Sequence, residues 1–251
     1  RRRHTRCSRD WSSDVCSSDL NNTSGNCNIA IGHGSLKSST IANNNIGLGT
    51  CTLFTNTSGL NNIAIGLKSL ANNTVGANNV GIGAYTLSRN ISGKYNVAIG
   101  ALAGLSLTSG SCNIAIGGYA LQSATLGDLN VAIGHCAGKK LTTCSCNVFI
   151  GAGAGCDATT ALNNTAVGRG AIASLTIGCE NIGVGNCAGG IQALRHAAQG
   201  GKRRQPAYFQ FVAQPDRAYR GAPHAVAGDG HAFDALGGHG GAADKIGRAH
   251  V

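Results

Sequence analysis

A five-residue pattern recurs along most of this chain at a fixed interval of 17 residues, and this repetition restricts the possible folds more than any other feature. The clearest copy is Asn62-Ile63-Ala64-Ile65-Gly66, in which a small residue lies between two branched apolar residues. Ten copies in strict register predict a stacked, quasi-one-dimensional architecture. The first and last residues of the copies are Asn28 and Gly32, Asn45 and Gly49, Asn62 and Gly66, Asn79 and Gly83, Asn96 and Gly100, Asn113 and Gly117, Asn130 and Gly134, Asn147 and Gly151, Asn164 and Gly168, and Asn181 and Gly185.

Columns of equivalent residues predict the structure of each unit. Two branched residues around a small one favour a short β-strand, whose side chains alternate between its two faces. A second column pair, a small residue followed by Leu as in Ser69-Leu70, is interpreted as a second short strand. A Thr column follows, and the Gly two residues later, as at Thr57 and Gly59, predicts a turn with positive φ. We therefore predict an all-β fold, a parallel β-solenoid or β-roll of ten 17-residue coils.

The Asn column has two possible interpretations. Stacked identical amides can hydrogen-bond to one another along a rod, or Asn is simply a turn residue tolerated at the start of a strand. We expect the ladder, because one coil buries too few apolar side chains to offset the conformational entropy of its own residues. Hydrogen bonds and packing between coils must supply the rest of the stability.

The two ends of the chain differ from the repeat. Residues 1–20 resemble the translation of a sequencing adapter used for indexed short reads, and residues 245–251 resemble that of its other strand, so we expect neither to be native. Residues 190–244 form a third segment, in which no Asn, Ser or Thr occurs from Ile191 to Asp244. It is interpreted either as out of frame with the repeat or as a disordered Gly/Ala/His-rich tail. The solenoid domain is therefore predicted over residues 21–189.

Charge and hydropathy exclude some partners. The formal net charge is +10, but residues 21–189 contain only seven Lys or Arg and three Asp or Glu. We expect no nucleic-acid partner, because this charge is dilute and such a partner needs a clustered basic face. No run of about 18 apolar residues occurs, so we expect no membrane insertion of this segment.

Cysteines and histidines suggest metal or redox chemistry only superficially. Cysteines in the same column lie at least two coils apart, about 10 Å, which is beyond the reach of a disulfide. Cys144-Ser145-Cys146 has no matching second pair for zinc, and His33 and His135 share a column but lie far apart along it. We expect reduced thiols and no metal site. The cysteines of the repeat are Cys27, Cys51, Cys112, Cys136, Cys144, Cys146, Cys156, Cys179 and Cys187.

No catalytic or cofactor-binding set is predicted. The Gly-rich run at 151–155 mimics a phosphate-binding loop, but the Lys-Ser/Thr that such a loop requires does not follow it. Asp128, Asp157 and Glu180 fall in different columns and form no carboxylate pair. We therefore expect a protein that is not an enzyme and needs no cofactor.

The repeated pentapeptide resembles the repeats in the head domains of trimeric autotransporter adhesins. It is still more similar to the Asn-Thr-Ala-Ile/Val-Gly repeats of phage tail fibres, matched here by Asn164-Thr165-Ala166-Val167-Gly168. The resemblance covers residues 21–189 and implies a left-handed solenoid, a homotrimer and an adhesive role. It further implies a location in a virion tail fibre or on a bacterial surface, with a host-surface glycan or protein as receptor. The 17-residue period departs from the adhesin head, and neither its coiled-coil stalk nor its membrane anchor is seen.

The function predicted from the sequence is a non-enzymatic fibrous segment that presents a receptor-binding surface. Candidate contact residues lie in the variable columns just after the repeated Gly: Lys68, Tyr85, Tyr119 and Arg169. Two alternatives stay open, a purely structural spacer and an ice-binding solenoid, although the latter needs two ranks of Thr per coil and only one occurs. A hexapeptide-type acyltransferase, which would show a six-residue period and a catalytic His at a cleft between subunits, is disfavoured because only one pentapeptide occurs in every 17 residues.

Overall fold

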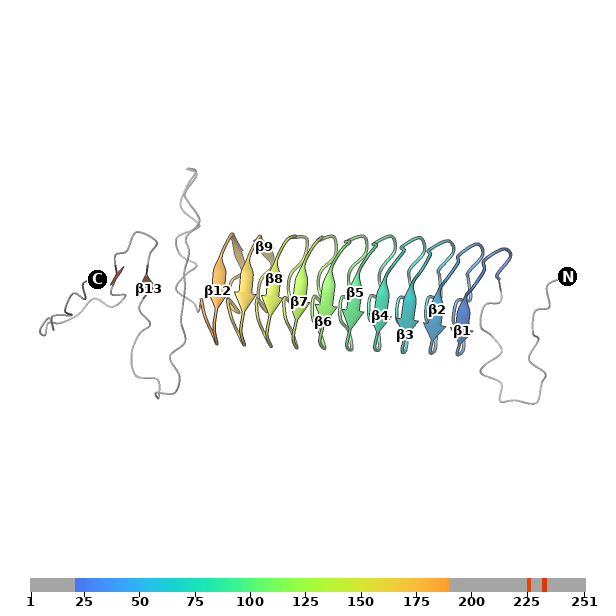
Figure 1. Cartoon of the computed structure of the whole chain (residues 1–251), viewed down its shortest axis with the longest axis horizontal. Helices are drawn as coiled ribbons and strands as arrows, with labels where there is room; N and C mark the ends of the chain where they lie inside the picture. The colour runs from blue at the N-terminus through green and yellow to red at the C-terminus, as the bar shows by residue number, and fades with distance from the viewer. Residues whose placement is uncertain (1–20, 190–224, 227–231, 234–251) are drawn as a thin grey trace, which may run out of the picture.

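The computed structural model describes residues 21–189 and two short strands further along the chain, β13 (Ala225–Val226) and β14 (Ala232–Phe233), which pair antiparallel. The predictions made for residues 1–20 and 245–251, and for nearly all of 190–244, lie outside the described residues. Residues 21–189 form a straight stack of coils, each starting at the Asn of the repeat (Figure 1).

Ten strands, one from each coil, form a single parallel sheet whose order follows the chain. Each strand pairs in register with the residues 17 positions away, as in Ile63↔Val80 and Ile65↔Ile82. The predicted parallel β-solenoid is confirmed: nine full turns connect the ten strands, and residues 21–189 contain no helix. The strands are β1 (Ile29–Ile31), β2 (Ile46–Leu48), β3 (Ile63–Ile65), β4 (Val80–Ile82), β5 (Val97–Ile99), β6 (Ile114–Ile116), β7 (Val131–Ile133), β8 (Val148–Ile150), β10 (Thr165–Val167) and β12 (Ile182–Val184).

The second strand predicted at the Leu column is wrong. Leu53 and Leu70 lie in a run of turns and have φ of 47° and 50°, in the left-handed region. Lys68, two residues before Leu70, is also left-handed (φ 53°). Left-handed residues are uncommon for side chains other than Gly, and two of them so close together curl the backbone tightly enough to turn the Leu side chain inward. A second pair of strands forms only near the C-terminal end of the rod, between β9 (Thr160–Leu162) and β11 (Ile177–Cys179).

Small residues fill the inside of each strand. In most strands the middle residue is buried and its two branched neighbours are partly exposed, as in β3 and β7. The interior of the coil is too thin for a larger side chain at most of these positions. At Gly47, for example, even an added Cβ would lie 2.5 Å from Ser35 Oγ. Leu36, Leu53, Leu70, Leu87 and Leu121 are fully buried and provide the larger part of the core. The branched residues of the strands must therefore face outward.

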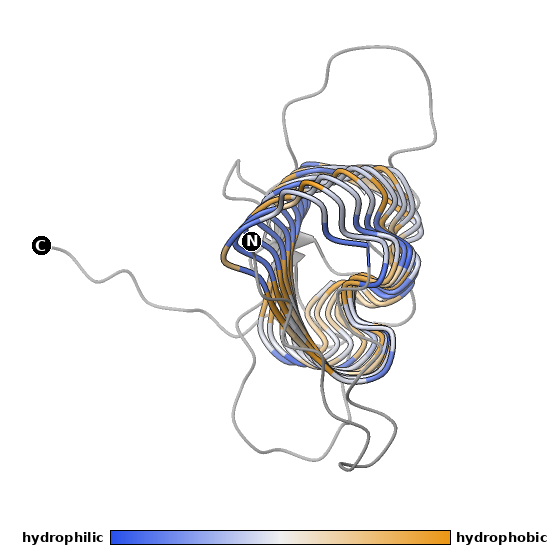
Figure 2. Ribbon diagram, turned by 90° about the vertical axis from the view of Figure 1, so that its right-hand side faces the viewer, coloured by the Kyte–Doolittle hydropathy of each residue, from blue (hydrophilic) through white to orange (hydrophobic). Residues whose placement is uncertain are grey.

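The Asn ladder is confirmed. Asn96 Oδ1 accepts hydrogen bonds from the main-chain N–H of Asn113 (3.0 Å) and from its Nδ2 (3.1 Å). Asn96 Nδ2 in turn donates to Asn79 Oδ1 (3.2 Å) and to the carbonyl of Gly110 (2.8 Å). Because Asn96 is fully buried, these bonds replace those that water would make. Viewed along the rod, the coils superpose (Figure 2), so the same geometry repeats at every step.

The core changes from polar to apolar along the rod. The first coils bury a second, shorter amide ladder, in which Asn73 donates to Asn56 (2.9 Å) and Asn90 to Asn73 (2.6 Å). In later coils the same column holds Leu107, Ala124, Leu141, Ala158 and Leu175, all buried. Hydroxyl pairs such as Ser69 and Thr86 (2.7 Å) are likewise followed by buried Ala from Ala103 onward.

In most coils the Gly after the Thr column has a role other than the predicted one, although Gly178 does have positive φ (152°). Gly59, Gly76 and Gly93 do not have positive φ. They are needed for space: a Cβ at Gly59 would lie 2.3 Å from the carbonyl oxygen of Gly76 in the next coil. Positive φ is instead found at the Gly that ends the pentapeptide, for example 114° at Gly66.

Removing one amide from the ladder should destabilise the rod. In the variant Asn96→Ala, the main-chain N–H of Asn113 and the carbonyl of Gly110 lose buried partners. We expect a loss of about 2–5 kcal/mol in the free energy of unfolding, since each buried unsatisfied group costs about 1–3 kcal/mol. Urea denaturation followed by circular dichroism measures it. The matched control is Asn72→Ala at an exposed position, which should change stability little; equal losses in both variants would contradict the ladder's role.

Phe149 substitutes for missing Leu side chains. It is the largest buried side chain and replaces the usual Ala or Gly in the middle of a strand. Its ring lies where side chains would otherwise extend from Gly138 and Gly155, which occupy the Leu column: a Cβ at these residues would be 2.9 and 2.7 Å from ring carbons. In this coil the large side chain is therefore in the strand column and Gly is in the Leu column, so the interior stays filled.

This exchange predicts a compensating pair of substitutions. Phe149→Ala alone should cost about 3–5 kcal/mol by leaving a cavity, and Gly155→Leu alone should destabilise by overpacking against the ring. The double variant should recover much of the loss, because it reproduces the Ala115 and Leu121 arrangement of another coil. A double-mutant cycle in urea measures the coupling. Simple additivity of the two losses would show that the columns do not share this volume.

Candidate functional site

The outward-facing branched residues of the ten sheet strands form an apolar surface, here called the sheet face. Each strand contributes its first and third residues, so two parallel ranks run the length of the sheet; nineteen of the twenty residues are Ile, Val or Leu, and one is Thr165. Six of these twenty residues are exposed, from 36% at Ile99 and Ile114 to 54% at Ile31, and the other fourteen are partly exposed. Nine steps of about 4.8 Å make the ranks roughly 43 Å long. A long apolar surface of this kind, even where it is only partly exposed, is typical of an interaction site.

A second surface lies where the chain leaves each strand. It is formed by the two columns after the repeated Gly and by two further columns in the following turn. These columns contain six of the seven Lys and Arg residues of 21–189, and we call the surface the cationic edge. Its basic residues are Lys37, Lys68, Arg89, Lys139, Lys140 and Arg169.

Aromatic rings lie against three of the lysines on the cationic edge. Lys68 Nζ is 5.9 Å from the ring centroid of Tyr85 in the next coil. Lys37 Nζ lies 5.2 Å from the ring of Phe54, again one coil further. Ammonium groups at this distance over a ring face are held by cation–π attraction. Residues from neighbouring coils therefore fix the positions of these charges.

A denser group surrounds Tyr119. Its ring lies edge-on to His135, with 5.6 Å between the centroids and 71° between the planes. Lys139 Nζ lies 5.2 Å from the same ring. Of the four contact residues predicted from the sequence, the structure thus brings Lys68 and Tyr85 together, and places Tyr119 with His135 and Lys139. Arg169 is exposed on the same edge, further along the rod.

The sequence interpretation missed Lys37, Phe54, His135 and Lys139 as members of this surface. The left-handed turn folds the second column after the Gly against a column three residues later in the next coil. The contact between Tyr119 and Lys139 follows from this geometry, and a Cβ at Gly34 would meet Phe54 in the same way, at 3.2 Å. Both pairs are 20 residues apart, so a search at one coil plus three residues could have found them.

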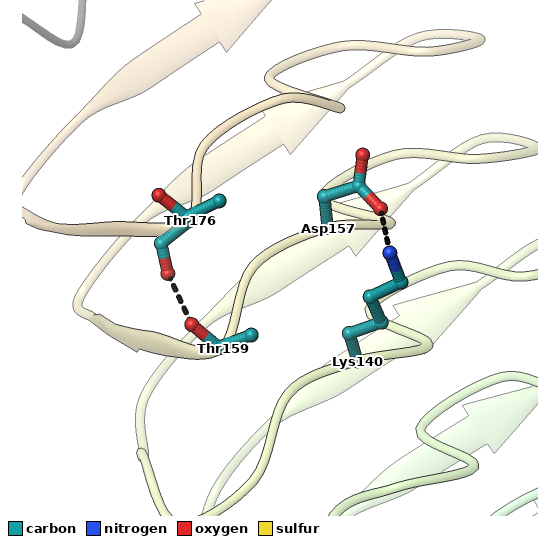
Figure 3. A network of polar contacts seen from close by, with 4 residues as sticks. All are labelled: Lys140, Asp157, Thr159 and Thr176. Carbon is teal, nitrogen blue, oxygen red and sulfur yellow. Dashed lines mark hydrogen bonds and ion pairs between the residues drawn. The ribbon is translucent and has the colours of Figure 1, made fainter.

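One ion pair partly neutralises the edge. Lys140 Nζ lies 2.8 Å from Asp157 Oδ1 in the next coil (Figure 3). The hydrogen bond from Lys140 to Asp157 and the carboxylate charge raise the pKa of Lys140. Burial raises the pKa of the neighbouring Cys156 thiol, with a smaller contribution from Asp157. Both effects keep Lys140 charged and Cys156 protonated at neutral pH.

The Thr column uses its hydroxyl groups for hydrogen bonds between adjacent coils. Thr159 Oγ1 donates to the main-chain carbonyl of Thr176 at 2.8 Å (Figure 3). The same bond joins Thr40 to Thr57 and Thr142 to Thr159. These hydroxyl groups therefore help to join one coil to the next.

The nine cysteines of the repeat are free thiols. Among the described residues, no group of three or more His, Cys, Asp or Glu side chains converges as a metal site. No helix there has the length and apolar character needed to span a bilayer.

Fold and surface together define the class of this protein, a parallel β-solenoid repeat protein. Comparison with known proteins adds no family to this class: no family model, no curated protein and no solved structure matches the chain significantly. The likeness to adhesin heads and tail fibres therefore depends on the repeat motif itself.

Proposed function

We propose that this chain is a non-catalytic segment of a phage tail fibre or bacterial surface adhesin. Three copies associate through the sheet face, and the resulting rod carries a receptor-binding surface outside the cell or on the virion. The observation that carries the proposal is the pair of outward-facing branched ranks, which are apolar in all ten strands except at Thr165 of β10.

A second copy of the same chain suits the sheet face. The side chains of the sheet face repeat at one fixed step along the rod. The sheet face of a second copy has the same step, so the two faces can interdigitate over their whole length. Burying apolar surface contributes about 25 cal/mol for each Å², and closed symmetric association is the common way in which one chain covers such a face. With three copies around one axis, every sheet face turns inward and the cationic edges stay accessible.

A fibre also fits the way in which the coils are joined. Main-chain hydrogen bonds link residues of adjacent coils throughout the turns as well as the strands, as in Leu70 N–H to Thr86 O (2.9 Å) and Asn72 N–H to Ser88 O (3.0 Å). Each coil depends on its neighbours alone, so the length of the rod can vary without changing its cross-section. Such a rod suits a part that holds a binding surface away from its point of attachment.

Ice binding is the less favoured alternative. It would require a flat face of regularly spaced, available Thr hydroxyls. Here the single Thr column donates its hydroxyls to carbonyls of the next coil, and the flat sheet carries mainly Ile and Val. A purely structural spacer differs from our proposal in needing no binding surface, and the test of the cationic edge below distinguishes the two.

The association state tests the proposal. Light scattering on the 251-residue chain should give three times its mass of 25.2 kDa. The variant Ile99→Lys/Ile114→Lys places charges on the sheet face and should dissociate the trimer, because buried unpaired charges are costly. The matched control, Ile41→Lys/Leu126→Lys, makes the same change in charge at exposed positions off the sheet face and should stay trimeric.

Two outcomes would contradict the trimeric fibre. A folded wild-type monomer with β-type circular dichroism would remove it and favour ice binding, which thermal hysteresis would then test. Dissociation of both lysine variants alike would show that charge in general, and not the sheet face, controls association.

A further inference from the structure

The charges of the rod are divided between the two ends of the strand. The cationic edge carries six Lys or Arg and one carboxylate, Asp157, a net charge of +5. The other charged residues of 21–189 are Lys94, Asp128 and Glu180, which lie in the columns just before the strand. The excess of positive charge in this segment therefore belongs to one edge. Such a one-sided distribution attracts and orients an anionic partner.

The lysines of this edge are partly fixed in place before any partner binds. Lys37, Lys68 and Lys139 each lie over an aromatic ring of an adjacent coil, at 5.2, 5.9 and 5.2 Å from its centroid. Ordering a free lysine on binding costs conformational entropy, and part of that cost has already been met in the folded rod. Fixed charges of this kind favour a partner whose own charges have a regular spacing.

The spacing of the charges distinguishes between anionic polymers. The edge runs from Lys37 in the first coil to Arg169 in the ninth, eight steps of about 4.8 Å or roughly 38 Å. A net charge of +5 over this length is one charge in about 8 Å. Double-stranded DNA carries one negative charge in about 1.7 Å, so most of its phosphates would lack a partner. A polysaccharide with one carboxylate in each disaccharide carries its charges at a spacing close to that of the edge.

The aromatic rings have a matching spacing. Phe54, Tyr85 and Tyr119 lie in the second, fourth and sixth coils, so a ring recurs every two coils, about 10 Å. All three are half-buried, which leaves part of each ring accessible. Aromatic rings stack against the C–H face of a sugar ring, and a repeat of two coils is comparable to the length of a disaccharide.

We infer that the cationic edge binds an acidic polysaccharide laid along the rod, with carboxylates on the lysines and sugar rings against Phe54, Tyr85 and Tyr119. This inference depends on the proposed receptor-binding role and names the chemical class of the receptor. Each basic or aromatic residue of the edge adds a weak contact, and binding becomes useful because several contacts act on one polymer. Affinity should therefore rise with the length of the polysaccharide and fall as the salt concentration increases.

The test uses the full chain and immobilised hyaluronan, which carries one carboxylate per disaccharide, with neutral dextran as the reference polymer. Wild type should bind hyaluronan and not dextran. Lys68→Glu and Lys139→Glu should each weaken binding several-fold, and together by roughly tenfold or more, by reversing charges that contact the polymer. The matched control is Lys94→Glu, the same change at the one basic residue of 21–189 outside the edge, which should bind like wild type.

Three results would overturn the inference. Equal binding by the edge variants and wild type would place the contact elsewhere, since the chain ends are the same in all variants. An equal loss in Lys94→Glu would indicate attraction to net charge alone. Tighter, lysine-dependent binding of a 20-base-pair DNA would identify a polyphosphate partner instead.

Circular dichroism and light scattering on the same samples separate this inference from the fibre proposal. An intact trimer that does not bind hyaluronan would contradict only the inference of an acidic receptor, and would favour the spacer role. A monomer that binds hyaluronan through Lys68 and Lys139 contradicts only the trimer.

Discussion

The buried Asn ladder is the interaction on which the rest of the rod depends. Each Asn side chain satisfies main-chain groups that the thin coil cannot satisfy by itself, as Asn96 does for Asn113 N–H and Gly110 O. An amide bonded in this way accepts no shift in register, because a slip of one residue would replace it with a branched apolar side chain. The ladder therefore fixes the 17-residue period, and the period aligns every other column. The Gly columns follow from the same constraint, since the coils stack too closely for a Cβ at Gly59.

A thin interior also determines the chemistry of the outer surface. Only Ala or Gly fits inside most strands, so the branched residues that favour a strand have to face outward. The result is an apolar face on a protein whose core is partly polar, with buried Asn56, Asn73 and Asn90 in its first half. Coils of this kind bury their apolar side chains incompletely as a single chain. Association through the sheet face would complete that burial, which is why the fold and the proposed trimer belong to one physical argument.

Much of this architecture could be predicted from the sequence, and the failures have identifiable causes. The period, the sheet strands and the Asn ladder follow from residues that recur at a fixed interval. Which face of the strand is turned toward the core could not be deduced from the sequence. In Ile-Ala-Ile, either the Ala or the two Ile side chains could face inward. The recurring pair Ser69-Leu70 was interpreted as a second strand, but the stacked turns hold Leu70 at a φ of 50°, which Leu seldom adopts by itself. The edge was recognised in part: Lys68 and Tyr85 share a column, but the contact of Tyr119 with Lys139 requires the path of the turn.

Inward and outward columns carry different kinds of information in this fold. Inward positions accept few residues, and even an exception such as Phe149 is offset by Gly138 and Gly155. Outward positions after the strand tolerate Lys, Tyr, Cys, His, Arg or Gly, since the coil constrains their backbone far more than their side chains. Different side chains there alter the surface without disturbing the stack. Surface side chains in one column of such a rod are separated by multiples of the coil spacing, so an extended polymer is the partner that can bind at several of them at once.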